Sequence, residues 1–437
     1  MSVVSVVRYA GAKSVMEAIE MSGAFAGIRP GDRVFVKPNI VFWSKVVQMP
    51  PYGVITTTSV VEPVVKYLRD LGAGEIVLSE GPVTTDPKAE GVAAHAFEAL
   101  GYNELARRYD LTVMDIFEAP FRQVELADGV SLGFSEAFLD ADVVVDLPVL
   151  KTHAQTKVSL AMKNLKGCID QKSRKLCHSA SHEMDLDFHV ARLASARENV
   201  VTVMDGIYSL ERGPGFSGKA RRSDLIVASS DILAADMVGA QLLGFKPEEI
   251  PHIAAMCEFK DRDATGTWIE TRGVPVEEAA SPHKWDFPYN PEGTLPAPMA
   301  HRGVSGLTFP KYDHSLCTYC SGIIGLLQFA LGAAYDGSPF DGVEVLTGKM
   351  HRPTKGMNHT LLLGKCQVLL NKNHPDINEA ILVPGCPPDL TKLVAGVKKA
   401  GIAIDENLFA HFDYAPAMFM GQYEGKPDFS LDLYTCS

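Results

Sequence analysis

Residues 142–153 read DVVVDLPVLKTH, and this stretch decides the fold. It opens with an apolar, β-branched run and closes on two side chains that can carry charge, Lys151 and His153. Apolar runs of this kind are typical of strands that are covered on both faces, as in parallel sheets with helices on each side. Ligands of such sheets bind outside the carboxyl ends of the strands. The stretch therefore predicts a buried parallel strand with a candidate site at its carboxyl end.

Similar short runs alternate with helical patterns over residues 1–272, which predicts an α/β domain with a largely parallel sheet flanked by helices. The other expected strands are Val3–Arg8, Arg33–Val36, Glu75–Ser79, Leu111–Asp115, Val200–Met204 and Asp224–Ala228. The expected helices are Ser59–Leu71, Ala89–Leu100, Asp187–Ala196 and Asp231–Leu243, and a hairpin is expected over Gln123–Phe134.

Two further regions follow this domain. Residues 273–312 are rich in proline and lack periodicity, so they are expected to form a linker or a wrapping segment. Residues 313–437 are expected to form a smaller C-terminal α/β domain that binds a metal cluster. Its expected elements are a helix over Thr318–Ala334, strands over Val343–Leu346, Thr360–Leu363 and Ala380–Val383, and a helix over Pro388–Ala400.

Composition excludes some classes of protein. The chain has 41 Lys and Arg residues against 53 Asp and Glu residues, a formal net charge of −12, which argues against binding to nucleic acid. The longest apolar stretch, residues 322–335, is too short to span a bilayer. The first ten residues lack the basic start of a signal peptide. We therefore expect a cytoplasmic protein without a membrane span.

Four of the eight cysteines form a candidate metal site: Cys317, Cys320, Cys366 and Cys386. Four thiolates suit either a [4Fe–4S] cluster or Zn²⁺. The sequence Gly385-Cys-Pro-Pro388 favours the cluster, because a Cys followed by Pro recurs in cluster-binding runs and the glycine lets backbone N–H groups approach a sulfide. Two alternatives stay open at this point: a redox dithiol at Cys317 and Cys320, or ordinary buried cysteines.

A local excess of basic residues marks a candidate anion site in the first domain. Residues 151–175 hold seven Lys and Arg side chains and a single acid, Asp170. We expect this segment to continue as a helix after the strand, with Ser159, Lys163 and Lys166 on one flank. Lys37 and Asn39 follow another strand and are expected to converge on the same crevice. The candidate anion-binding residues are Lys37, Asn39, Lys163, Asn164 and Lys166, with His153 and Lys151 as candidate catalytic residues.

Several motifs taken together resemble one known family. They are Gly31–Asn39 (GDRVFVKPN), Thr58–Pro63 (TSVVEP), Glu80-Gly81, Leu147–His153 (LPVLKTH), Met162–Gly167 (MKNLKG) and Asp205-Gly206. Over about residues 30–245 the chain resembles the family known as domain of unknown function 362, whose members are often described as iron–sulfur proteins. The resemblance implies a fold and an association with redox chemistry, but no particular reaction. Many members resemble this domain joined to compact C-x2-C-x2-C-x3-C-P runs, which this chain lacks, so at most one cluster is expected.

These patterns together lead to an expected function. We expect an iron–sulfur oxidoreductase that acts on an anionic small molecule, with one [4Fe–4S] cluster relaying electrons and His153 donating a proton. An iron–sulfur lyase, dehydratase or isomerase is the first alternative, and a non-enzymatic electron-transfer or maturation protein is the second. The expected partners are the anionic substrate and an electron-donor protein, and the sequence leaves a homo-oligomer open.

Overall fold

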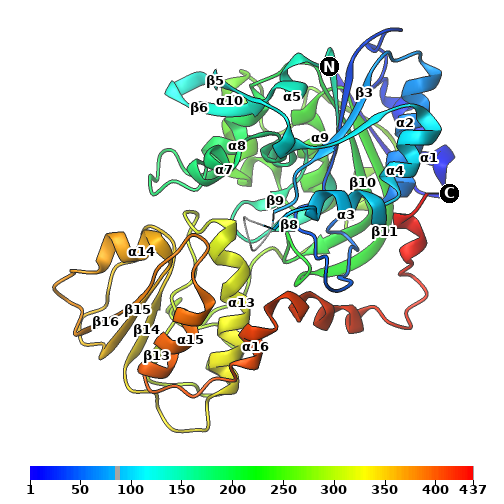
Figure 1. The fold of residues 1–437 in the computed structure, drawn as a ribbon. Coiled ribbons are helices and arrows are strands. Elements are labelled where there is room, and N and C mark those ends of the chain that lie inside the picture. The colour runs from blue at the N-terminus through cyan, green and yellow to red at the C-terminus, as the bar shows by residue number, and fades with distance from the viewer. Residues whose placement is uncertain (84–88, 437) are drawn as a thin grey trace.

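A computed structural model of the protein describes residues 1–83 and 89–436. These residues form two modules, each built on its own sheet and its own hydrophobic core (Figure 1). The large module holds most of residues 1–290, and the core of the small module runs from Leu295 to Phe409. The predicted fold class, a largely parallel sheet flanked by helices with a smaller C-terminal α/β module, is confirmed.

The described residues of the large module form a ten-stranded sheet in the order β12-β1-β11-β10-β7-β2-β3-β4, with β8 beside β10 and β9 beside β8. Neighbouring strands from β10 to β4 are parallel, whereas β11 is antiparallel to β10 and to β1. The strands are β1 (Ser2–Arg8), β2 (Val34–Pro38), β3 (Ile76–Glu80), β4 (Thr112–Asp115), β7 (Val143–Leu147), β8 (Val149–His153), β9 (Lys157–Ser159), β10 (Val200–Glu211), β11 (Lys219–Ser229) and β12 (Ile269–Gly273).

Helices cover both faces of this sheet, which is why the central strands β2, β7 and β10 are buried along their whole length. In β2, Phe35 packs into one core while Val34 and Val36 pack into the other, because successive side chains of a strand point to opposite faces. One face is covered by α1 (Ala12–Ser22), α2 (Thr58–Asp70), α3 (Val92–Ala99) and α4 (Tyr102–Tyr109). The other is covered mainly by α5 (Glu136–Asp140), α6 (Ala161–Asn164), α8 (Leu186–Ala194), α9 (Ile232–Leu242) and α10 (Pro251–Phe259), with α7 (Gln171–Leu176) nearby. The predicted hairpin is present as β5 (Phe121–Glu125) and β6 (Ser131–Ser135).

The small module is a parallel four-stranded sheet with the strand order β13-β14-β15-β16. Its core lies between the sheet and the helices α13 and α15. The elements are α12 (Ala297–His301), β13 (Leu307–Thr308), α13 (Thr318–Ala333), β14 (Val343–Leu346), β15 (His359–Leu363), α14 (Gly364–Asn371), β16 (Glu379–Val383), α15 (Leu390–Lys399) and α16 (Asn407–Ala410). The predicted strands and the two longer helices of this module are confirmed, while β13 and α14 were not predicted.

The chain then returns to the large module, so the module boundaries differ from the predicted ones. After α16, the segment 412–436 runs back across the molecule and packs beside β10 and β11 (Figure 1). Tyr423 and Tyr434 belong to the core on the α1–α4 face of the large sheet. Part of the proline-rich segment 273–312 also belongs to a core, since Leu295 and Met299 pack inside the small module. Within the described residues, no helix combines the length and the apolar composition that crossing a membrane requires.

Candidate functional site

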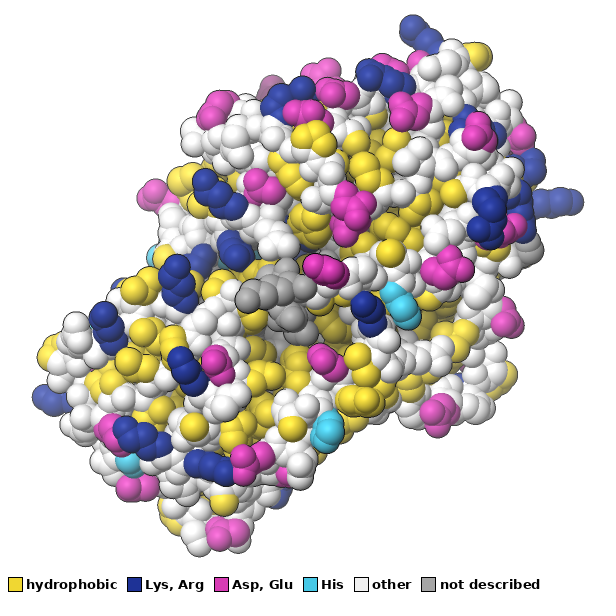
Figure 2. Space-filling model, viewed as in Figure 1, with side chains coloured by type: hydrophobic (Ala, Val, Ile, Leu, Met, Phe, Trp, Pro, Cys, Tyr) yellow, Lys and Arg dark blue, Asp and Glu magenta, His cyan; other side chains and the backbone are white. Residues whose placement is uncertain are grey.

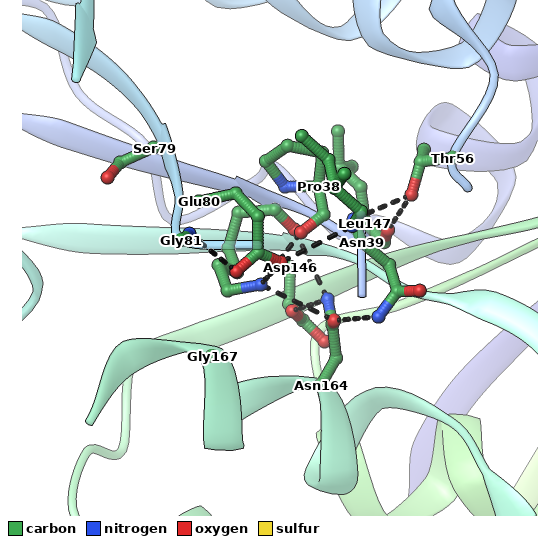
Figure 3. A network of polar contacts seen from close by, with 12 residues as sticks. Pro38, Asn39, Thr56, Ser79, Glu80, Gly81, Asp146, Leu147, Asn164 and Gly167 are labelled. Atoms are coloured by element: carbon green, nitrogen blue, oxygen red, sulfur yellow. Dashed lines mark hydrogen bonds and ion pairs between the residues drawn. The ribbon is translucent and has the colours of Figure 1, made fainter. Parts of the chain in front are cut away.

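Polar side chains gather at the carboxyl ends of the central strands, as predicted. Lys37 near the end of β2 is in register with Asp146 of β7, and Glu80 ends the neighbouring strand β3. Figure 3 shows Glu80, Asp146 and Asn164 pointing toward one another at this edge of the sheet. The strand order explains this meeting, because the ends of adjacent parallel strands lie side by side.

Lys37 and Glu80 form a buried ion pair. Their side chains are 0% and 4% exposed, and the Lys37 ammonium group also donates to the carbonyl of Pro38 at 2.8 Å. Gly167 lies directly against the pair, since a Cβ atom there would be 2.5 Å from the Lys37 Nζ atom. The charge of Lys37 is therefore neutralised inside the protein, and little of this lysine is left to bind an external anion.

Asn39, Asn164 and Asp146 continue the network. The Asn39 Nδ2 atom donates to Asn164 Oδ1 at 2.6 Å, and Asn164 Nδ2 donates to Asp146 Oδ1 at 2.7 Å (Figure 3). Burial raises the pKa of the Asp146 carboxyl well above its usual range, although the positive charge of Lys37 opposes this shift. Lys151 joins from β8: its ammonium group donates to Asn39 Oδ1 and, at 2.8 Å, to the carbonyl of Val54. The pKa of this lysine lies well below its usual range, because the side chain is buried and lies near Lys163.

Sequence reasoning missed the acidic half of this network. It selected Lys37, Asn39, Lys151 and Asn164 but neither Glu80 nor Asp146 as a site residue. Glu80 directly follows one predicted strand and Asp146 is the residue before the last of another, and that position was the signal that could have found them. The structure brings all six side chains together as a buried hydrogen-bonded scaffold.

A second group of basic side chains lies on the outer side of this scaffold. Lys163 and Lys166 are both half-buried. Burial and the nearby Lys166 lower the pKa of Lys163 to about 7, and burial lowers the pKa of Lys166 to about 8. Lys166 Nζ lies 2.8 Å from His178 Nε2, whereas Lys163 has no hydrogen-bond or ion-pair partner among residues 1–83 and 89–436.

His153 lies in the same group. Burial and the nearby Lys163 hold the pKa of its imidazole well below the usual value, so the ring is neutral near pH 7. Its Nδ1 atom accepts a hydrogen bond from the backbone N–H of Gln155 at 3.0 Å. The ring proton then belongs on Nε2, which is free to donate a hydrogen bond or to offer a proton.

The predicted helix after His153 is wrong in its first half. Residues 149–159 instead form the antiparallel pair β8 and β9, and the helix α6 begins only at Ala161. Ser159 therefore lies on a strand and shares no helical flank with Lys163 and Lys166. The register explains the change: pairing of Lys151 with Ser159 satisfies backbone groups that a longer helix would have used.

The four predicted cysteines lie at one edge of the small sheet. Cys317 is the N-cap of α13, Cys320 is in the first turn of that helix, Cys366 is in the first turn of α14, and Cys386 follows β16. A hydrogen bond of 2.8 Å from the backbone N–H of Lys365 to the carbonyl of Gly385 joins two of these segments. At Gly364, where φ is 87°, an added Cβ atom would lie 3.1 Å from the Cys320 sulfur. A side chain is therefore excluded next to this thiol.

The four thiols interact with one another. A hydrogen bond from Cys320, reinforced by Lys349 and Lys166, lowers the pKa of Cys317 to about 6. Cys317 in turn raises the pKa of Cys320, with burial and the nearby Cys366 and Cys386 acting in the same direction. Within the described ranges, no three His, Cys, Asp or Glu side chains are grouped tightly enough to hold a single metal ion.

The basic group and the cysteines meet where the two modules touch. His178 Nδ1 lies 3.1 Å from the carbonyl of His314, and the Lys349 ammonium group donates to the carbonyl of His178. Gln155 Nε2 donates to the carbonyls of Asp313 and Leu316 at 2.8 and 2.9 Å. A cavity of about 450 Å³ opens beside this junction, lined by Arg174, Lys175, Cys317 and Tyr319 among other residues.

Three comparisons place the chain among known proteins. Residues 34–241 match the family described as domain of unknown function (DUF362). The chain is 29% identical over 248 residues to thylakoid-associated protein sll1697 of Synechocystis sp., a match that covers 56% of this chain and 73% of that protein.

The large module also has a distant structural neighbour. It is similar, with a TM-score of 0.31 and 12% identity, to the lactate racemase apoprotein from Thermoanaerobacterium thermosaccharolyticum. That match covers 56% of this chain and 57% of the other, and at this level neither the fold nor the activity of that enzyme transfers. The resemblance expected from the sequence motifs is confirmed by the family match, which includes β2, Lys163 and Lys166, and the whole buried scaffold. Over residues 34–241 the chain is therefore similar to the DUF362 family.

Proposed function

We propose that the protein is an iron–sulfur oxidoreductase that acts on an anionic small molecule bound at the junction of its two modules. One observation carries the proposal: the basic group of the large module and the cysteines of the small module adjoin each other. Lys166 contacts His178, whose ring contacts the carbonyl of His314, three residues before Cys317. An anion held by the lysines would therefore lie next to the cysteine site.

The cysteines fit an iron–sulfur cluster better than a zinc ion. Structural zinc sites usually pair their cysteines in two tight knuckles, whereas only Cys317 and Cys320 of this set are closely spaced in the sequence. A [4Fe–4S] cluster is held by four thiolates, each on a different iron, and so accepts a wider spacing of its ligands. Cys317, Cys320, Cys366 and Cys386 would hold the cluster, which would supply one-electron transfer when bound.

The structure narrows the residues proposed to hold the anion. Lys37 and Lys151 are fully buried and hydrogen-bonded within the protein, so we assign them to the scaffold that positions β8 and α6. Lys163 and Lys166 are half-buried and belong to a group with a surplus of positive charge, which suits binding of a carboxylate or phosphate. His153 would donate a hydrogen bond from Nε2 to the same anion, and after protonation it would serve as a proton donor.

Electron paramagnetic resonance tests the cluster and the anion site in one sample. The protein is purified without oxygen and reduced with dithionite, and spectra are recorded with and without acetate, succinate or phosphate. We expect a cluster signal that at least one of these anions shifts. The shift should disappear in Lys163→Met and Lys166→Met variants and persist in Lys172→Met, which removes an exposed lysine of α7. A signal that no anion changes, or that changes equally in all three variants, would contradict an anion site beside the cluster.

A further inference from the structure

The second side of the cysteine site faces solvent. Cys317, Cys320 and Cys366 are half-buried, and Cys386 is exposed. Cys366 lies on α14, one turn before the exposed residues of that helix. The surface next to the cysteine site is therefore the outer face of α14 and the residues around it.

Exposed leucines lie on α14 and on the strand beside it. In α14, Leu369 is 65% and Leu370 is 37% exposed, and Leu382 of the adjacent edge strand β16 is 44% exposed. Leu369 and Leu370 are three and four residues after Cys366, so these side chains share one face of the helix. Clustered exposed apolar side chains of this size are typical of an interaction site.

Basic side chains frame the leucines. Lys365, Leu369 and Lys372 follow one another at helical spacing and are exposed. Arg352 is exposed in the loop beside α14, since Asn371 Nδ2 donates to the carbonyl of the neighbouring residue His351 at 2.9 Å. No ion-pair partner is found for Lys365, Lys372 or Arg352 within residues 1–83 and 89–436. Figure 2 shows dark-blue side chains set among yellow ones on the lobe that corresponds to the small module.

The region around these side chains carries a positive charge, whereas the chain as a whole is negatively charged. Residues 347–400 contain eight Lys and Arg residues and three Asp and Glu residues, although the chain as a whole has a net charge of −12. Two of the three acids are already engaged: Glu379 pairs with Lys399 and His359, and Asp389 caps α15. A local positive surplus of this kind steers oppositely charged partners to the surface that carries it.

We propose that this surface, made of Arg352, Lys365, Leu369, Leu370, Lys372 and Leu382 on and beside the helix that carries Cys366, docks an acidic one-electron carrier protein. The kind of partner rests on the proposed iron–sulfur function, whereas the surface itself rests on exposure and charge alone. In the encounter, the carrier gives up one electron and one electron is taken up at the cysteine site, with no bond made or broken. The basic rim steers the partner, and the leucines provide the dry centre of the contact.

Binding of an acidic plant-type [2Fe–2S] ferredoxin tests this surface. We expect binding at low salt that weakens strongly at about 0.5 M salt, where charges are screened beyond about 4 Å. Lys365→Glu combined with Lys372→Glu should weaken binding at least tenfold at low salt, and Leu369→Ser should weaken it at both salt concentrations. The matched control is Lys13→Glu combined with Lys260→Glu, which changes the net charge equally at exposed lysines of the large module and should leave binding unchanged. Circular dichroism and thermal unfolding verify that each variant is folded.

Three results would overturn the docking surface. Equal weakening by both double variants would mean that only net charge matters. Loss of binding to phosphatidylglycerol vesicles, but not to ferredoxin, in the α14 variants would assign the surface to a membrane. A self-association that Leu369→Ser abolishes would assign it to a second copy of the chain. Iron content, measured on the same samples, separates this test from the test of the proposed function. Ferredoxin binding through α14 in protein without iron would support the docking surface and contradict the cluster. Iron without ferredoxin binding would support the cluster and contradict the docking surface.

Discussion

The Lys37 ammonium group lies against the Glu80 carboxylate with both side chains removed from water. Breaking such a pair from one side leaves a buried charge without compensation, which costs about 3–5 kcal/mol. We therefore predict that Lys37→Met lowers the free energy of unfolding by about this amount, measured by urea denaturation. Lys66→Met is the matched control, because Lys66 pairs with Asp70 at the surface, and it should leave the free energy of unfolding unchanged. A stable Lys37→Met protein would show that the pair contributes nothing to the fold.

If the proposed anion site is present, Lys163 would make its affinity for anions depend on pH. Its pKa of about 7 reflects burial first and Lys166 second, with Asp187 and Cys177 acting in the opposite direction. The titratable groups around it are Lys151, His153, Lys166, Cys177, His178 and Asp187. An anion favours the protonated amine, so binding should be tightest below pH 7 and weaken as pH rises through 7, by up to about tenfold per unit for one coupled proton.

Calorimetric titration with phosphate or succinate between pH 6 and 9 measures this dependence. The Lys163→Met variant should bind more weakly at pH 6 and lose the part of the pH dependence that lies near 7. If the variant keeps the full dependence, another group controls the binding.

The helix α6 illustrates how one element is positioned by another far along the chain. The Asp236 carboxylate in α9 accepts hydrogen bonds from the backbone N–H groups of Ala161 and Met162, at 2.7 and 3.1 Å. It thereby caps α6 and fixes the direction in which Lys163 projects. Asp236→Ala should lower the free energy of unfolding by about 2 kcal/mol and also weaken anion binding.

A second variant separates the general effect of losing a helix cap from the specific effect of losing Asp236. Asp185 caps α8 by accepting from the backbone N–H of Phe188 at 2.9 Å. Asp185→Ala should therefore reduce stability without changing affinity for the anion, as measured by urea denaturation and calorimetry. Equal losses of affinity in both variants would contradict a specific role for Asp236.

Elements with their own local signal could be predicted from the sequence. The apolar runs of β2, β7 and β10 and the helical patterns of α2, α9 and α13 are strong because most of their buried residues are apolar. The helix expected directly after His153 failed in its first half because its apolar residues also suit a strand, and only the pairing of β8 with β9 decides between the two. The short helix α14, which carries Cys366, has polar buried positions such as Gln367 and Asn371 and so lacked a clear apolar stripe.

In the candidate site, too, only the features with a local sequence signal could be predicted. The lysines and cysteines were found because their residue types stand out at strand ends and in spaced motifs. The neutralisation of Lys37 by Glu80 depends on the order of the strands, which no local pattern contains. The meeting of Lys166 with the cysteines depends on how two modules dock, and that is a property of tertiary contacts alone.

The returning segment ties the two modules into one molecule. Phe429 stacks on Tyr208 with 5.4 Å between ring centroids, and the Tyr208 hydroxyl donates to the carbonyl of Asp428 at 3.0 Å. Tyr434 is buried in the same aromatic group. Tyr434→Ala should lower the free energy of unfolding by about 3 kcal/mol, the usual range for a buried aromatic side chain. Tyr414→Ala, which removes a ring that is 54% exposed, should have no effect beyond error, and thermal unfolding of the two variants provides the comparison.

The proposed function requires that the four cysteines of the small module hold an iron–sulfur cluster beside Lys163 and Lys166. Chemical analysis of iron, acid-labile sulfide and zinc in anaerobically purified protein tests it most directly. We predict about four iron and four sulfide per chain. Both should be lost in Cys366→Ser and kept in Cys436→Ser, which replaces a cysteine outside the set. About one zinc per chain without sulfide, or no metal at all, would contradict the claim.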